Sequence, residues 1–178
     1  DPDLLYDIAS LYSRIGQKSL AEQTLQQVIR IDPNHAAACN DLGFSWADAG
    51  THLARAEALV RTAVAEDPDN QSFLDSLGWV LYKRGHFDEA KQYLQAAISE
   101  SSRPDPVVLD HLGDTLDRLE EPAQAALEWK RARERLGAPD AADRDDIKAL
   151  RVHLDAKIKA TAAGEKADTA AVGDEMKK

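Results

Sequence analysis

A Leu-Gly pair recurs along this chain at a constant interval of 35 residues. The repeated pairs are Leu42-Gly43, Leu77-Gly78 and Leu112-Gly113, and Ile8-Ala9 fills the same position upstream. A second series of small residues keeps the same period and consists of Ala21, Ala56, Ala90 and Ala125. Two positions that repeat in phase predict a solenoid, in which each unit buries its core only by stacking on its neighbours.

Each unit contains two amphipathic stretches with helical periodicity. The third unit has Leu74, Leu77 and Leu81 on one stripe and Ala90, Leu94 and Ala97 on the facing stripe. Gly78 is small where two helix backbones approach, so a larger side chain there is expected to cost ~1–3 kcal/mol. Gly50 and Gly85 are expected to end first helices in the left-handed conformation. Asp67-Pro68 is expected to end a second helix, because proline disfavours helical geometry in the residue before it.

These units resemble the tetratricopeptide repeat (TPR), a pair of helices of about 34 residues. The residues that match the family pattern are Leu77, Gly78, Gly85, Phe87, Ala90, Leu94 and Ala97 in the third unit, with Pro33 and Pro68 after the first two. The departures are Ala9 in place of glycine, Pro122 in place of an aromatic residue, and an additional residue at Thr51-His52. The resemblance implies an all-α, right-handed solenoid of four helix pairs that acts as a noncatalytic scaffold for protein partners. The repeats look more like those of bacterial TPR proteins, and the start at Asp1 inside a repeat-like helix suggests a fragment of a larger one.

The sequence divides into a repeat array, a cap and a tail. The expected repeat units are residues 2–35, 36–70, 71–105 and 106–139. Residues 142–162 are expected to form a capping helix with Ile147, Leu150, Leu154 and Ile158 on its buried stripe. The residues expected on the solvent side of that helix are Lys148, Arg151, Lys157 and Lys159. Residues 163–178 contain almost nothing to bury and are predicted to be disordered.

Function is expected to reside in the inner groove, where stacking aligns the first helices of the four units. The candidate partner-binding residues are Tyr6, Asn40, Phe44, Asp75, Trp79, Tyr82, Asp110, Asp114 and Asp117. Exposed aromatic side chains carry much of the binding energy at interfaces, so Phe44, Trp79 and Tyr82 are the expected anchors. Asn40 is a candidate donor or acceptor for a peptide backbone. The acidic end of the groove favours a peptide or partner helix with an apolar or aromatic residue beside Lys or Arg.

Three alternatives remain open at this stage. The aromatic residues could fill the space between neighbouring first helices, with the aspartates forming only a solvated face. Exposed repeat edges could instead join copies of the chain into an oligomer. An enzyme is disfavoured, because the five histidines lie in separate units or turns and no phosphate or dinucleotide loop is present.

Charge and composition exclude several classes of ligand. A carboxylate clamp of the kind found in some chaperone-binding TPR proteins is rejected, since only Asn40 matches it and Asp75 and Asp110 stand where basic residues would be needed. The net charge of -10 disfavours nucleic acid. Neither a metal site nor a cofactor is predicted, and the sequence contains no run of apolar residues long enough to span a membrane. The compartment stays open, with bacterial cytoplasm and periplasm both compatible.

Overall fold

The computed structural model describes residues 1–99, 101–137 and 144–169, and this part of the chain is entirely helical apart from its turns and terminal segment. The helices are α1 (Pro2–Arg14), α2 (Lys18–Ile31), α3 (Ala36–Asp48), α4 (Leu53–Glu66), α5 (Gln71–Lys83), α6 (Phe87–Ser99), α7 (Pro106–Arg118), α8 (Pro122–Arg135) and α9 (Asp145–Ala162). None of these helices is long and apolar enough to cross a membrane. The predicted all-α solenoid is confirmed.

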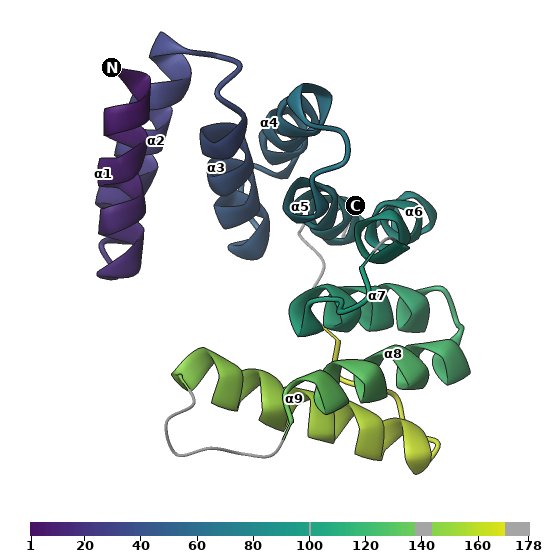
Figure 1. Ribbon diagram of the computed structural model, residues 1–178. Coiled ribbons are helices and arrows are strands. Elements are labelled where there is room, and N and C mark those ends of the chain that lie inside the picture. The colour runs from purple at the N-terminus through teal and green to yellow at the C-terminus, as the bar shows by residue number, and fades with distance from the viewer. Residues whose placement is uncertain (100, 138–143, 170–178) are drawn as a thin grey trace.

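The helices form four antiparallel pairs that stack into a curved array (Figure 1). Each second helix packs against the first helix of the next pair, and the first helices α3, α5 and α7 also pack against one another in order. The first pair is joined to the array mainly through α2 and α3, while α1 and α3 have few backbone contacts and meet through side chains (Figure 1). The array is therefore looser at its N-terminal end than between α3 and α7.

The repeated glycines lie where the two helices of a pair make their closest contact. A Cβ atom on Gly78 would lie 2.5 Å from Cγ of Leu94, and one on Gly43 would lie 2.8 Å from the carbonyl oxygen of Ala56. Gly113 faces the indole ring of Trp129 in the same way. The predicted close approach is confirmed at Gly78, and Gly43 and Gly113 are packed as tightly.

The turns inside the pairs repeat as regularly as the glycine contacts do. Gly50 and Gly85 adopt φ angles of +68° and +82°, as the sequence predicts for left-handed helix ends. The fourth unit has Glu120 at the equivalent position, and this residue adopts a φ angle of +60°. The shape of the turn is thus kept even where glycine is absent.

Helix α9 closes the C-terminal end of the array against α8, with Leu154 fully buried and Leu150 and Ile158 packed beside it. The prediction that Arg151 and Lys157 face solvent is wrong, because both side chains are buried. They lie on the same stripe as Leu154, at a spacing of three residues, so the buried face of α9 is wider than its apolar residues indicate. The described helix starts at Asp145, and residues 142–143 of the predicted cap lie outside the described residues.

The chain reverses direction after α9. Gly164 adopts a φ angle of +73°, and the backbone N–H of Glu165 donates to the carbonyl of Ala160 at 2.9 Å. Ala167, three residues after Gly164, is only 6% exposed and belongs to the core cluster that contains Leu154. The structure differs here from the predicted disorder, because the turn returns an otherwise polar segment to the body of the repeat array. Residues 170–178 of the predicted tail lie outside the described residues.

Candidate partner-binding groove

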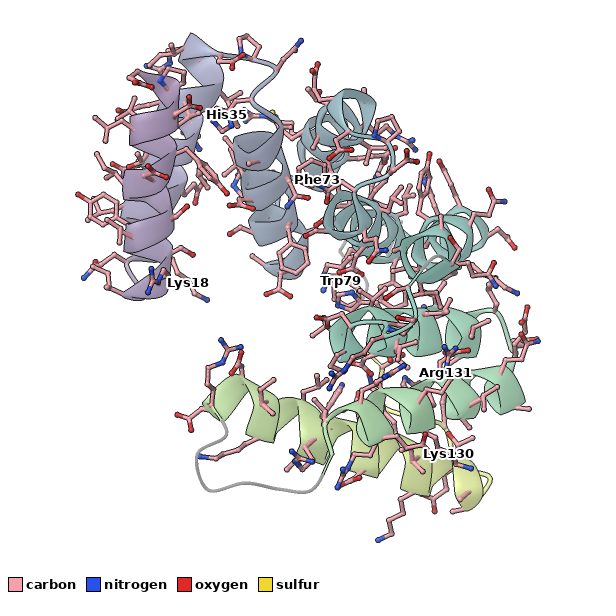
Figure 2. All side chains as sticks on the ribbon, viewed as in Figure 1. Lys18, His35, Phe73, Trp79, Lys130 and Arg131 are labelled. Carbon is pink, nitrogen blue, oxygen red and sulfur yellow. The ribbon has the colours of Figure 1, made fainter. Side chains whose placement is uncertain are left out.

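The first helices of the pairs line one side of the array, and this side has two different halves. The open half is formed by α1, α2 and α3 and contains an accessible cleft. The filled half is formed by the inner residues of α5 and α7 together with α9 and residues 165–169. Lys18 marks the start of α2 at the open half, and Trp79 lies between α5 and α7 (Figure 2).

The cleft of the open half has a volume of about 360 Å³. Its lining consists of Ala9, Ser10, Ser13, Lys18, Ala21, Glu22, Leu25, Asp41, Phe44, Ser45 and Asp48. The half-buried ring of Phe44 packs against the core and supplies the aromatic surface of this lining. Asp41 and Asp48 give the α3 side of the cleft an acidic character, and Lys18 is the one basic residue in the lining.

A polar contact joins α1 to α3 at one edge of the open half. The hydroxyl of Tyr6 donates to Oδ2 of Asp41 at 3.0 Å, and the Tyr6 ring lies 5.1 Å from the ring of His35. Burial and the neighbouring Asp41 raise the pKa of Tyr6 above its usual value. Asn40 is buried and donates to Oδ1 of Asp41 at 3.3 Å, while its own Oδ1 has no hydrogen-bond partner among the described residues. Tyr6 and Asn40 therefore both orient the carboxylate of Asp41.

The aromatic residues of α5 are buried in the filled half. Trp79 stacks between Tyr82, at 5.1 Å, and His111 of α7, at 4.1 Å, where the distances join ring centroids. Trp79 is 5% exposed and Tyr82 is 0% exposed, so the expectation that both are exposed anchors is wrong. Trp79 does leave the core stripe of its own unit, as the helical spacing indicates, but α7 of the next unit covers it. Burial raises the pKa of Tyr82 to about 12, and its hydroxyl is hydrogen-bonded to the side chain of Thr169.

His111 connects the aromatic stack to a carboxylate. Its Nδ1 lies 2.9 Å from Oδ1 of Asp75, one of the predicted binding residues. Burial by itself would lower the pKa of His111, but the negative charge of Asp75 outweighs this effect and the pKa is raised. This pairing was not predicted from the sequence. The signal that could have identified it is the separation of 36 residues between Asp75 and His111, which places them at nearly the same position of adjacent first helices.

Two of the predicted acidic residues of α7, Asp110 and Asp114, already have a basic partner inside the chain. Lys157 of α9 donates to Oδ1 of Asp110 at 2.7 Å and also to Oδ1 of Asp114. The Lys157 side chain is 1% exposed. Asp114 also accepts a hydrogen bond from Nε1 of Trp129 at 3.2 Å. The cluster is therefore a buried ion-pair network rather than a solvated face.

Asp117 is the candidate acidic residue of α7 that stays partly accessible. Its Oδ2 has no hydrogen-bond partner among the described residues, and burial raises the pKa of this carboxyl group. Lys166, Arg118 and Lys157 lie close enough to oppose that rise. Across the described residues, no three His, Cys, Asp or Glu side chains are placed to hold a metal ion.

Comparisons with known proteins agree with this architecture. The tetratricopeptide repeat family matches residues 2–35 and, separately, residues 72–100. The TPR repeat-containing protein PA4667 of Pseudomonas aeruginosa is 35% identical over 114 residues, which cover 64% of this chain and 19% of that protein. The chain thus spans about a fifth of the length of this curated relative.

Two groups of solved structures share the fold. MamA from Desulfovibrio magneticus RS-1 superposes with a TM-score of 0.66 at 20% identity, covering 79% of this chain and 78% of the MamA chain. PilW, a type IV pilus biogenesis factor, superposes with a TM-score of 0.73 at 19% identity, covering 94% of this chain and 73% of that chain. The repeated Leu-Gly positions, the stacked helix pairs and these matches lead to one conclusion: the chain carries tetratricopeptide repeats.

Proposed function

We propose that the open half of the groove binds a segment of a partner protein in which an apolar or aromatic residue lies beside Lys or Arg. The TPR fold makes the chain a protein-interaction scaffold in general terms, and the proposal gives that scaffold a noncatalytic role and a location for its ligand. The observation that carries the proposal is the accessible cleft with Phe44 beside Asp41 and Asp48.

The chemistry of the cleft supports this choice of ligand. The ring of Phe44 offers an apolar contact, and partial desolvation in a concave surface strengthens such contacts. Asp48 is exposed at the same cleft, and Asp41 is held in place by Tyr6, so both carboxylates face an incoming cation with little reorganisation. A segment rich in Asp or Glu would be repelled by the same residues.

The filled half does not contribute to this proposed site in the described state. Trp79 and Tyr82 are buried in the aromatic stack, and Asp110 and Asp114 are paired with Lys157. Binding a partner through these side chains would require existing internal contacts to break first. The residues that we assign to partner binding are therefore Tyr6, Asp41, Phe44 and Asp48.

Peptide selection offers a direct test. A phage-displayed library of random peptides is selected on the immobilised chain, and the affinity of enriched peptides is measured by fluorescence anisotropy. We expect enrichment of peptides with an aromatic or large aliphatic residue next to Lys or Arg. Phe44→Ala is expected to weaken their binding by about tenfold or more, because it removes the apolar anchor. Asp48→Lys is expected to weaken binding and to reduce its dependence on salt concentration.

Two variants serve as matched controls for this experiment. Leu127→Ala shortens an exposed apolar side chain on α8, and Glu134→Lys makes the same charge change as Asp48→Lys on that helix. Both are expected to bind the selected peptides as the wild type does. Equal binding by Phe44→Ala and the wild type, with circular dichroism spectra that match, would contradict the proposal.

A second candidate function, self-association, is favoured by the exposed surface of α1. Leu4, Leu11 and Ile15 are 59%, 55% and 68% exposed and lie at spacings of seven and four residues, with Leu4 and Leu11 on one face of α1 and Ile15 directly after its end. An apolar stripe of this kind is typical of a surface that another protein covers. In this second proposal, the α1 stripes of two copies of the chain pack against each other.

Light scattering over a concentration series tests the second candidate. The wild type is expected to gain mass as concentration rises, whereas Leu11→Glu is expected to keep the monomer mass, because a buried carboxylate in the stripe opposes association. Val152→Glu places the same group on an exposed site of α9 and should behave as the wild type does. A constant monomer mass for all three proteins would rule out self-association through α1 at these concentrations.

A further inference from the structure

We infer that the surface formed by Tyr82 and the C-terminal part of α7 is a docking surface for an extended, lysine-containing segment, and that residues 165–169 of the chain itself are its resident occupant. This inference extends beyond the partner site in the open half. The ligand of the filled half is then a segment of the chain itself, and a partner can reach this surface only when that segment leaves.

Three contacts along the segment support the assignment. Ala167 is buried in the core cluster that also contains Leu154 and Leu116. Lys166 lines a cleft of about 450 Å³ together with Asp117, Arg118, Glu120 and Pro122. Thr169 is hydrogen-bonded to the hydroxyl of Tyr82 on α5. The segment therefore contacts two consecutive repeat units, in the way that an extended ligand would in a solenoid groove.

One charge of the segment complements the surface, while its two carboxylates, Glu165 and Asp168, are exposed. Lys166 lies near the carboxyl group of Asp117, whose Oδ2 has no hydrogen-bond partner among the described residues. Ala167 follows it directly and is small enough to fit against α7. Lysine beside a small apolar residue is a minimal form of the basic and apolar chemistry that we propose for the partner of the open half.

The geometry of the turn at Gly164 explains how such a short segment stays bound. Its contacts with the groove are few, so a free peptide of this sequence would bind weakly. Tethering by the turn to α9 makes docking intramolecular, with an effective concentration in the millimolar range for a short linker. A partner segment with stronger contacts is then able to displace it, and this last step rests on the proposed function of the groove.

Chemical modification of Tyr82 tests the inference without any partner. The full chain is treated with tetranitromethane, and nitration at each tyrosine is measured by mass spectrometry, with half-buried Tyr12 as the internal reference. We expect Tyr82 to be protected in the wild type. Ala167→Glu is expected to raise its nitration rate on the order of tenfold, because a carboxylate that must stay hydrated cannot remain against α7 and the segment opens locally.

The control and a second variant separate release of the segment from unfolding. Ala163→Glu makes the same substitution at an exposed residue just before the turn and should leave Tyr82 protected. Lys166→Glu places a like charge beside Asp117 without touching the core, and it should raise nitration less than Ala167→Glu does. Unchanged circular dichroism and thermal midpoints confirm that the array stays folded.

Three results would overturn the inference. Tyr82 could react in the wild type as fast as Tyr12 does, or it could stay protected in both Ala167→Glu and Lys166→Glu. Protection that increases with protein concentration would mean that the occupant comes from a second copy of the chain. Because no partner is present, these results do not depend on whether the open half binds peptides.

Discussion

Replacement of Lys157 by methionine is expected to lower the free energy of unfolding by roughly 3–5 kcal/mol at neutral pH. Methionine keeps most of the apolar stem of the side chain but removes the ammonium group that both Asp110 and Asp114 contact. The Asp114 side chain is 2% exposed, so its charge cannot be compensated by water once the ammonium group is lost. The measurement is chemical denaturation followed by far-ultraviolet circular dichroism.

Lys159→Met is the matched control, because Lys159 is exposed on the same helix. This variant is expected to change stability by less than about 0.5 kcal/mol. In the Lys157→Met background, Asp114→Asn should cost much less than it does alone, since it then removes a carboxylate that has already lost the Lys157 ammonium group rather than half of an ion pair. Additive effects of the two substitutions would contradict the network, as would a loss below about 1 kcal/mol for Lys157→Met.

The fold follows from the sequence because its determinants are local and repeated. The Leu-Gly pair at Leu77-Gly78 recurs at the same position of the neighbouring units. Gly50 and Gly85 end first helices at the same position of two successive units. Contacts of this kind lie within one unit or between adjacent units, so a pattern of about 34 residues contains most of the information. Even the turn at Glu120, which lacks glycine, is maintained by the units around it.

The filled half of the groove could not be predicted in the same way, because its contacts join residues that no repeat relates. Lys157 and Asp110 are 47 positions apart, and the periodicity of α9 does not show which neighbour its buried face meets. Lys157 was predicted to face solvent because it is not one of the apolar residues that form the stripe of α9. The signal that could have identified the ion pair was a lysine at three-residue spacing from Leu154 in a chain whose fourth first helix carries Asp110 and Asp114.

The burial of Trp79 also depends on a contact with another repeat unit. Its position on α5 excludes it from the core of its own unit, which made it a candidate anchor. His111 of the next unit then covers the ring, and its own position is fixed by Asp75. In a solenoid, a large inner side chain can pack against the next first helix or remain available to a ligand, and composition alone does not separate these outcomes. Phe44 differs because the inner surface beside it, toward α1, remains open.

The second large effect is expected at Gly113, where alanine should lower the free energy of unfolding by roughly 1–3 kcal/mol despite its higher helix propensity. A Cβ atom at this position would lie 2.5 Å from Cδ1 of Trp129, well inside normal contact distance. The indole cannot move away freely, because its Nε1 donates to Asp114 and the Lys157 ammonium lies 5.5 Å from the ring. Relief of the clash would therefore disturb the buried ion-pair network.

Gly78→Ala provides the comparison within the same repeat position. There the added atom meets the flexible side chain of Leu94, which can adopt another rotamer, so the expected loss is smaller than at Gly113. The first unit already carries Ala9 at this position, with Leu25 in the same buried cluster. Gly113→Ala should accordingly cost less in a Trp129→Leu background than in the wild type, a difference that a double-mutant cycle measures. Equal costs in both backgrounds would mean that the indole of Trp129 is not what excludes a side chain at Gly113.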